Sequence, residues 1–222
     1  HGAPVIPYPL VRATVLTLAP AERVRAAPRA IADVAARAGA PVSVVVAHLH
    51  RSAVAGDEAT AITLAAQASR AVEDDDQLVA ARAWHAAADI TSDERRRRQM
   101  ALSAARIYLT QTTATHDMPG LLDVLSRVPL ASEDRAWLEW LRAEVLADSD
   151  LAASAAAALA AATHAASSHP SLVPWLLWDA AASAWSADAP DMALEAARRL
   201  DAWATDPDGI PAPPWLPTAL LG

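Results

Sequence analysis

The chain has 222 residues, a net charge of −8, no cysteine and no lysine. This composition excludes disulfides, thiolate zinc sites and cysteine nucleophiles, and it also excludes Schiff-base and P-loop lysines. The negative charge argues against direct nucleic-acid binding by this chain, because neutralising phosphates requires a basic face.

Alanine makes up much of the 54 % apolar content, and glycine is scarce. Alanine is the best helix former and lets helices approach closely, so we predict an all-α protein. Phenylalanine is absent, which leaves eight tryptophans as almost the only aromatic bulk. The lack of lysine and asparagine indicates the codon bias of a GC-rich bacterial genome.

Residues 1–39 are predicted to form a linker with short helices. Pro9 opens one helix, since a proline in the first turn loses no hydrogen bond. A second helix is expected from residue 20 to about residue 38, and Gly39 ends it. Pro28 falls inside this helix and is expected to kink or split it.

Residues 41–56 are rich in valine and admit either a strand or a helix. The polar residues His48, His50 and Arg51 break the alternation that a strand requires. The flanking segments are helical, so we favour a helix that ends at Gly56.

From residue 57 onward, apolar helices alternate with short polar breaks. Helix pairs are predicted to begin near Asp57, Ser92, Ser132 and Ser171, at spacings of 35, 40 and 39 residues. This period is typical of helix-turn-helix solenoids, in which each pair buries its apolar face against its neighbours. We predict antiparallel helix pairs stacked as a tetratricopeptide-like right-handed superhelix over residues 40–206, followed by a Pro-rich tail at 207–222.

The most apolar run, residues 151–166, begins after Asp150, contains His164 and is mostly alanine. We interpret it as a packed helix rather than a membrane span, and no signal peptide is evident. A cytoplasmic protein that engages no membrane is therefore expected. The chain begins at His1 without a methionine, which suggests an excised fragment with a tag remnant at residues 1–2.

Two short motifs in residues 7–39 resemble a junction found in a known family. Pro9 to Arg12 reads Pro-Leu-Val-Arg, and Pro20 to Arg23 reads Pro-Ala-Glu-Arg. Together with the segment up to about residue 115, they resemble large ATP-binding regulators of the LuxR family, common in actinobacteria. In these proteins the motifs follow a winged-helix part and precede a tetratricopeptide-like array. Pro28 departs from the family pattern, in which the helix continues.

The resemblance implies a central regulatory piece of a transcription factor that receives an effector or a protein partner. The family's ATP-binding domain and DNA-binding helix-turn-helix are absent from this sequence, so neither activity is carried over.

Arg95 to Arg98 is the densest positive run. Four consecutive helical residues lie about 100° apart around the axis, so they form no stripe for a DNA groove. We interpret the run as a solvated or ion-paired surface. The alternative is a partner-docking patch that includes Arg95 and Arg98.

Tryptophans gather in the second half of the chain. Trp137 and Trp140 are neighbours on one side of their helix, rotated away from a predicted core stripe of Leu138, Leu141 and Val145. Trp140 is therefore expected to face a second neighbour, a groove or solvent. A second set occupies one face of a later helix: Trp175, Trp178 and Trp185. These tryptophans either line an aromatic groove for a ligand or peptide, or fill gaps in an alanine-rich core.

No catalytic, metal or cofactor motif occurs in the sequence. His48 and His50, two residues apart on a helix, point to different faces and cannot chelate one metal together. We therefore predict no cofactor and no catalysis.

We predict a non-catalytic regulatory or sensor domain of a LuxR-type regulator that binds a protein partner or a small-molecule effector, with homodimerisation a further option. The alternative is a free-standing tetratricopeptide-like scaffold. An all-α enzyme is a third option, and it would need a deep polar pocket.

Overall fold

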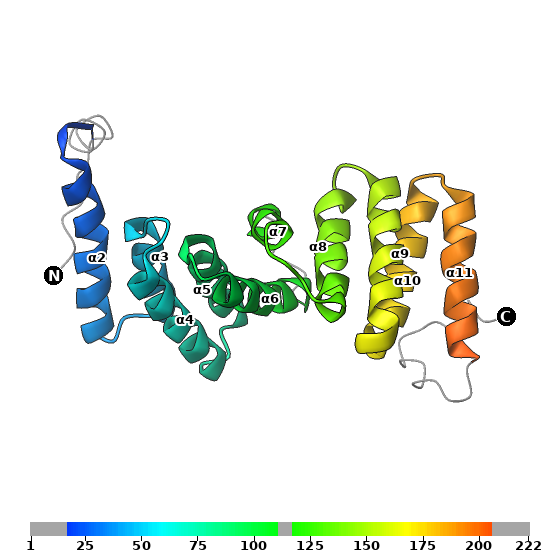
Figure 1. Cartoon of the computed structure of the whole chain (residues 1–222), viewed down its shortest axis with the longest axis horizontal. Helices are drawn as coiled ribbons and strands as arrows, with labels where there is room; N and C mark the ends of the chain where they lie inside the picture. Colours follow the sequence, from blue (N-terminus) through cyan, green and yellow to red (C-terminus); the bar gives the residue numbers. More distant parts are fainter. Residues whose placement is uncertain (1–16, 111–116, 206–222) are drawn as a thin grey trace. The chain divides into compact units, whose positions relative to one another are not determined.

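The computed structural model describes residues 17–110 and 117–205, and every regular element in these residues is helical. Ten α-helices, α2 to α11, follow one another in pairs of adjacent elements (Figure 1), which confirms the all-α prediction. The chain divides into two compact units, residues 1–92 and 93–222. The predicted short helix opened by Pro9 and the Pro-rich tail lie outside the described residues.

The first unit contains four described helices in which each packs against the next. They are α2 (Ala21–Arg37), α3 (Val42–Ser52), α4 (Glu58–Glu73) and α5 (Gln77–Ile90). Helix α3 also contacts α5, so α3, α4 and α5 meet around one core. The most deeply buried side chains of this core include Leu49 and Leu64.

Helix α2 runs through Pro28 as one helix, so the predicted split does not occur, and the alternative of a kink at this residue stays a prediction. A proline removes a single backbone hydrogen bond, and the packing of α2 against α3 accounts for the continuity of the helix. Gly39 ends the helix as predicted, with a φ of +67° that suits glycine.

The valine-rich segment is helical, but helix α3 stops at Ser52 and not at Gly56. The Ser52 hydroxyl donates to the Leu49 carbonyl at 2.8 Å, and Ala53 is extended. The amide of Gly56, with a φ of +84°, then donates to the Ile90 carbonyl at 2.6 Å. This contact with the end of α5 draws the chain out of helical geometry before the glycine is reached.

The second unit contains six described helices and two short 3₁₀ turns. The helices are α6 (Glu94–Thr110), α7 (Met118–Ser126), α8 (Arg135–Ala147), α9 (Leu151–Ser168), α10 (Val173–Ser186) and α11 (Pro190–Ala204). The 3₁₀ turns, Ser132–Asp134 and Pro170–Leu172, precede α8 and α10. Helix α9 packs against both α8 and α10, and α10 packs against α11 (Figure 1).

All four predicted pair starts coincide with helix starts: α4, α6, α8 and α10 each open a pair. The right-handed sense of the predicted superhelix stays a prediction, as do the predicted boundaries at residues 39 and 206. No helix in the described part of the chain is long and apolar enough to cross a membrane.

Alanine is the commonest buried residue in the described helices. In α9 the fully buried residues are almost all alanine, including Ala155, Ala158, Ala161 and Ala162. Ala161 and Ala162 share a core cluster with Leu176 and Leu177 of α10, and Ala158 shares one with Ala180. A methyl side chain contributes little apolar area, so many such contacts at short range are needed to stabilise the stack.

Because the helices pack closely through alanine, we expect the stability of the protein to depend strongly on the size of the side chains at these positions. We expect Ala158→Leu, at a fully buried position of α9, to lower the free energy of unfolding by about 1–3 kcal/mol through overpacking. The matched substitution Ala156→Leu, at an exposed position of the same helix, is expected to change it by less than about 0.5 kcal/mol. Urea denaturation measures both values, and equal effects would contradict this account of the core.

Candidate functional site

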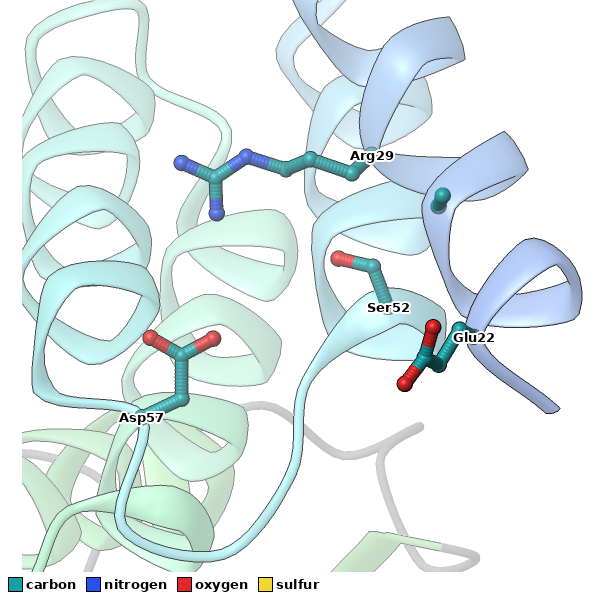
Figure 2. A pocket seen from close by; sticks show the side chains of 5 residues that line it. Glu22, Arg29, Ser52 and Asp57 are labelled. Carbon is teal, nitrogen blue, oxygen red and sulfur yellow. The ribbon is translucent and has the colours of Figure 1, made fainter.

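A polar hollow of about 310 Å³ opens between α2, α3 and the start of α4. It is lined by Glu22, Ala26, Arg29, Ser52 and Asp57. Figure 2 shows the Arg29 guanidinium extending from α2 across the hollow, above the Asp57 carboxylate. Glu22 and Ser52 lie on the α2 and α3 side.

The Thr60 hydroxyl, which is fully buried, connects the two charged groups of this hollow. It accepts a hydrogen bond from the Arg29 guanidinium at 2.6 Å and donates one to the Asp57 carboxylate at 2.6 Å. The Thr60 amide also donates to Asp57 at 3.0 Å, so Asp57 is the N-cap of α4. The hydrogen bond from the Thr60 hydroxyl is the main reason that the pKa of Asp57 is lowered.

Three of the polar side chains that line the hollow, Arg29, Ser52 and Asp57, make bonds of their own, and Glu22 is exposed. The Ser52 hydroxyl donates to the Leu49 carbonyl, and the Asp57 oxygens accept from Thr60. Arg29 lies 3.8 Å from Asp33 as well as bonding Thr60. The arrangement fastens α2 to α4, and it aligns no nucleophile with a base.

Removal of the Thr60 hydroxyl tests this fastening. We expect Thr60→Val to lower the free energy of unfolding by about 1–3 kcal/mol, because Arg29 and Asp57 lose their shared partner. Thr63→Val, on the same helix, serves as the control. Because the folded pKa of Asp57 is lowered, its contribution is present above its unfolded pKa and is lost as the pH falls through the folded pKa. The deficit of Thr60→Val should therefore shrink in acid, as measured by urea denaturation across pH.

Trp137 is the buried member of the tryptophan set, with 8 % of its surface exposed. Its indole N–H donates to Nε2 of His169 at 3.2 Å, which requires the neutral His169 tautomer protonated on Nδ1. The Trp140 ring stacks on the Trp137 ring, with the two ring centroids 5.8 Å apart. The Arg106 guanidinium lies 5.4 Å from the centroid of the Trp137 ring. Trp137 thus links α6, α8 and the residue after α9, and fills space between them.

Helix α8 buries a different set of residues from the predicted stripe. Leu141 is buried, but Leu138 and Val145 are only half-buried, whereas Ala136, Trp137 and Ala143 are buried. The reason is that α8 contacts α6 and α7 as well as α9, so its buried surface is wider than one stripe. Trp140 is half-buried against the core shared by α9 and α10, which matches the expected second neighbour.

The three tryptophans of α10 lie on its outward side. Trp175 is 47 % exposed and Trp185 is 79 % exposed, while Trp178 is half-buried. Trp185 therefore fills no gap in the core. Of the arginine run, Arg95 is exposed, and Arg98 is half-buried with its guanidinium 3.5 Å from the Pro129 carbonyl.

Trp137 and Trp185 are the least and the most exposed members of the tryptophan set, so their substitutions can be compared directly. We expect Trp137→Ala to lower the free energy of unfolding by about 3–5 kcal/mol, because it empties a buried site. Trp185→Ala should change it by less than about 0.5 kcal/mol, because the side chain is exposed. Chemical denaturation followed by circular dichroism measures both values without relying on tryptophan emission.

Two carboxylates that the sequence analysis did not single out, Glu144 of α8 and Asp179 of α10, have pKa values that the fold raises. Burial raises the pKa of Glu144, and the negative charge of Asp179 raises it further. Burial also raises the pKa of Asp179. The Trp140 indole N–H donates to the Glu144 carboxylate at 3.2 Å, which partly offsets the rise. The sequence signal was a tryptophan followed four residues later by an acid, which occurs on both helices.

Neutralising either carboxylate is expected to stabilise the protein. Because both pKa values are raised on folding, these two groups contribute most to stability when they are protonated, and that contribution is lost as the pH rises through their folded pKa values. At pH 7 we expect Glu144→Gln or Asp179→Asn to raise Tm by about 2–4 °C. The gain should vanish in acid below the unfolded pKa values. Glu133→Gln, an exposed residue before α8, removes the same charge and should leave Tm unchanged.

Histidines and acids elsewhere form no comparable site. Among residues 17–110 and 117–205, no group of three or more His, Asp or Glu side chains could hold a metal ion. Nδ1 of His48 is buried, and within that same part of the chain it has no hydrogen-bond partner. His50 is exposed.

Comparison with protein families, with curated proteins and with solved structures found no match to this chain. Its function must therefore be inferred from the geometry of the fold and of these sites.

Proposed function

We propose that this chain is a non-catalytic, cytoplasmic helical-repeat domain that binds a protein partner or a small-molecule effector as the regulatory part of a LuxR-type transcriptional regulator. The observation that carries the proposal is the surface of α8 and α10, where Trp140 and Trp175 accompany two half-buried carboxylates. Partly exposed tryptophans on rigid helices are typical of binding hot spots.

The helix-pair arrangement supports a binding role. Each pair exposes one side of its first helix, and successive first helices, such as α8 and α10, bring side chains from distant parts of the sequence together. The resemblance to LuxR-type regulators is supported by Pro20 to Arg23, which stand at the start of α2 as the family pattern implies. Pro9 to Arg12 lie outside the described residues.

We expect this surface to bind a protein or a small molecule and not a nucleic acid. The net charge is −8, and Glu144 and Asp179 would repel phosphates. In the arginine run, Arg96 pairs with Asp93 at 3.6 Å, which reduces the charge the run can offer. Direct nucleic-acid binding is therefore outside the proposed function.

A free-standing scaffold is the second candidate. Trp185, at 79 % exposed, favours it because a fully solvated tryptophan suits a large protein partner better than a small effector enclosed in a pocket. In that case the native gene would encode neither an ATP-binding domain nor a helix-turn-helix.

The proposed binding role predicts that a ligand is detectable through tryptophan emission. In a screen of small metabolites and peptides, at least one should quench tryptophan emission saturably and raise Tm. The response should be lost in Trp175→Ala and kept in Trp84→Phe, which alters a tryptophan of α5. If the Trp175→Ala variant retained the quenching, the binding site would lie elsewhere than on α10. Sequencing the native gene tests the regulator assignment separately, since a gene lacking both flanking domains would leave only the scaffold.

A further inference from the structure

Helix α2 buries an alanine and exposes two larger aliphatic side chains. It packs against α3 (Figure 1), and Ala32 is the buried member among the side chains of α2 that the structure describes. Ile31 is 47 % exposed and Val34 is 57 % exposed. Burying either of these side chains against α3 would remove more apolar area from water than burying Ala32 does. Packing within the first unit therefore does not account for their outward position.

The exposed apolar residues of α2 form one stripe. Ala27, Ile31, Val34 and Ala38 are all exposed and follow one another at intervals of four, three and four residues, so they share one side of the helix. Ile31 and Val34, together with Ala30 and Ala35, line a hollow on this side. We call Ala27, Ala30, Ile31, Val34 and Ala38 the α2 outer face. Its spacing is that of a helix that meets a second helix along a seam.

Arginine borders the α2 outer face at both ends. Arg23 stands one turn before Ala27, Arg37 stands one turn after Val34, and both arginines are exposed. Within residues 17–110 and 117–205, neither of them has an ion-pair partner. Two positive charges are therefore available beside the apolar stripe.

The acids of the α2 and α3 pair lie on the opposite side of α2. Helix α3 contains no acid, and the two acids of α2 are Glu22 and Asp33. Glu22 lines the polar hollow beside Arg29, and Asp33 lies 3.8 Å from Arg29. At about 100° per residue, both acids stand roughly 160° or more around the helix axis from Ile31. The α2 outer face is thus apolar along its length and positively charged at its ends.

This pattern selects the chemistry of the occupant. An apolar stripe with seam spacing fits the apolar side of another helix, and Arg23 and Arg37 call for acids at the border of that side. The two arginines are 14 residues apart, which is two heptads and about 21 Å along the helix. A second copy of α2 would supply the same arginines and no acid at this face. Residues 1–16 also contain no acid, and Arg12 is their only arginine.

We propose that the α2 outer face docks an amphipathic helix of a protein partner, with apolar side chains of that helix against Ile31 and Val34 and its acids against Arg23 and Arg37. This inference goes beyond the proposed function, because it assigns a separate docking surface to the first unit and does not depend on a ligand at α8 and α10. Charge complementarity selects an acidic helix, and the exposed aliphatic side chains supply the apolar contact.

The test uses two fluorescein-labelled peptides of four heptads with leucine at positions a and d. One peptide has glutamate at positions e and g, and the other has lysine there, so that like charges keep each peptide from pairing with itself. Fluorescence anisotropy with the full chain at pH 7 should show that the glutamate peptide binds at least about tenfold more tightly than the lysine peptide. Net charge alone would give the reverse order, since the chain carries −8.

Matched variants locate the binding on α2. Ile31→Gln should weaken binding of the glutamate peptide about tenfold. Ile62→Gln, at a 50 % exposed isoleucine of α4, should change it less than about twofold. Arg37→Glu should weaken the glutamate peptide and strengthen the lysine peptide, each about fivefold, whereas Arg95→Glu at an exposed position of α6 should change neither more than about twofold. Circular dichroism melts check that each variant is folded.

Several results would overturn the proposal. Equal binding of the two peptides, or tighter binding of the lysine peptide, would remove charge complementarity, and equal losses in Ile31→Gln and Ile62→Gln would remove the site. Concentration-dependent self-association that Ile31→Gln abolishes would make a second copy the occupant. If the glutamate peptide did not bind and Ile31→Gln lowered Tm while Ile62→Gln did not, another part of the chain would cover the face.

Discussion

Alanine supplies more than half of the buried apolar residues in the described part of the chain, and its contacts between helices set the constraint on which the rest of this protein depends. Such contacts stabilise only when helices approach closely, and close approach leaves little room for large side chains. The fully buried face of α9, built from Ala155, Ala158, Ala161 and Ala162, is the clearest case. Bulky residues are accommodated where helices diverge, as at Trp137, or are displaced outward, as at Trp185.

Polar side chains stabilise the first unit at the places where alanine cannot. The Arg29 guanidinium joins α2 to α4 through a 2.6 Å hydrogen bond to the Thr60 hydroxyl, which itself donates to Asp57 at the start of α4. Glu58 accepts hydrogen bonds from the Thr91 hydroxyl and the Ser92 amide, which ties the start of α4 to the end of α5. These contacts span about thirty residues of sequence or more and fix how neighbouring helices are stacked.

The second unit shows the opposite use of charge. Burial disfavours the ionised forms of Glu144 and Asp179, and the negative charge of Asp179 disfavours that of Glu144 further. Neither group has an ion-pair partner in the described ranges 17–110 and 117–205, so no cation offsets this cost.

The sequence by itself determined the helical class and the four pair starts, because alanine content, acidic caps and apolar periodicity are local signals. It did not determine the end of α3, the continuity of α2 through Pro28 or the buried residues of α8. Each of these depends on a neighbouring helix. Only the tertiary structure brought together Arg29 with Thr60 and Glu144 with Asp179, since these pairs lie 31 and 35 residues apart and meet only after the helices have stacked.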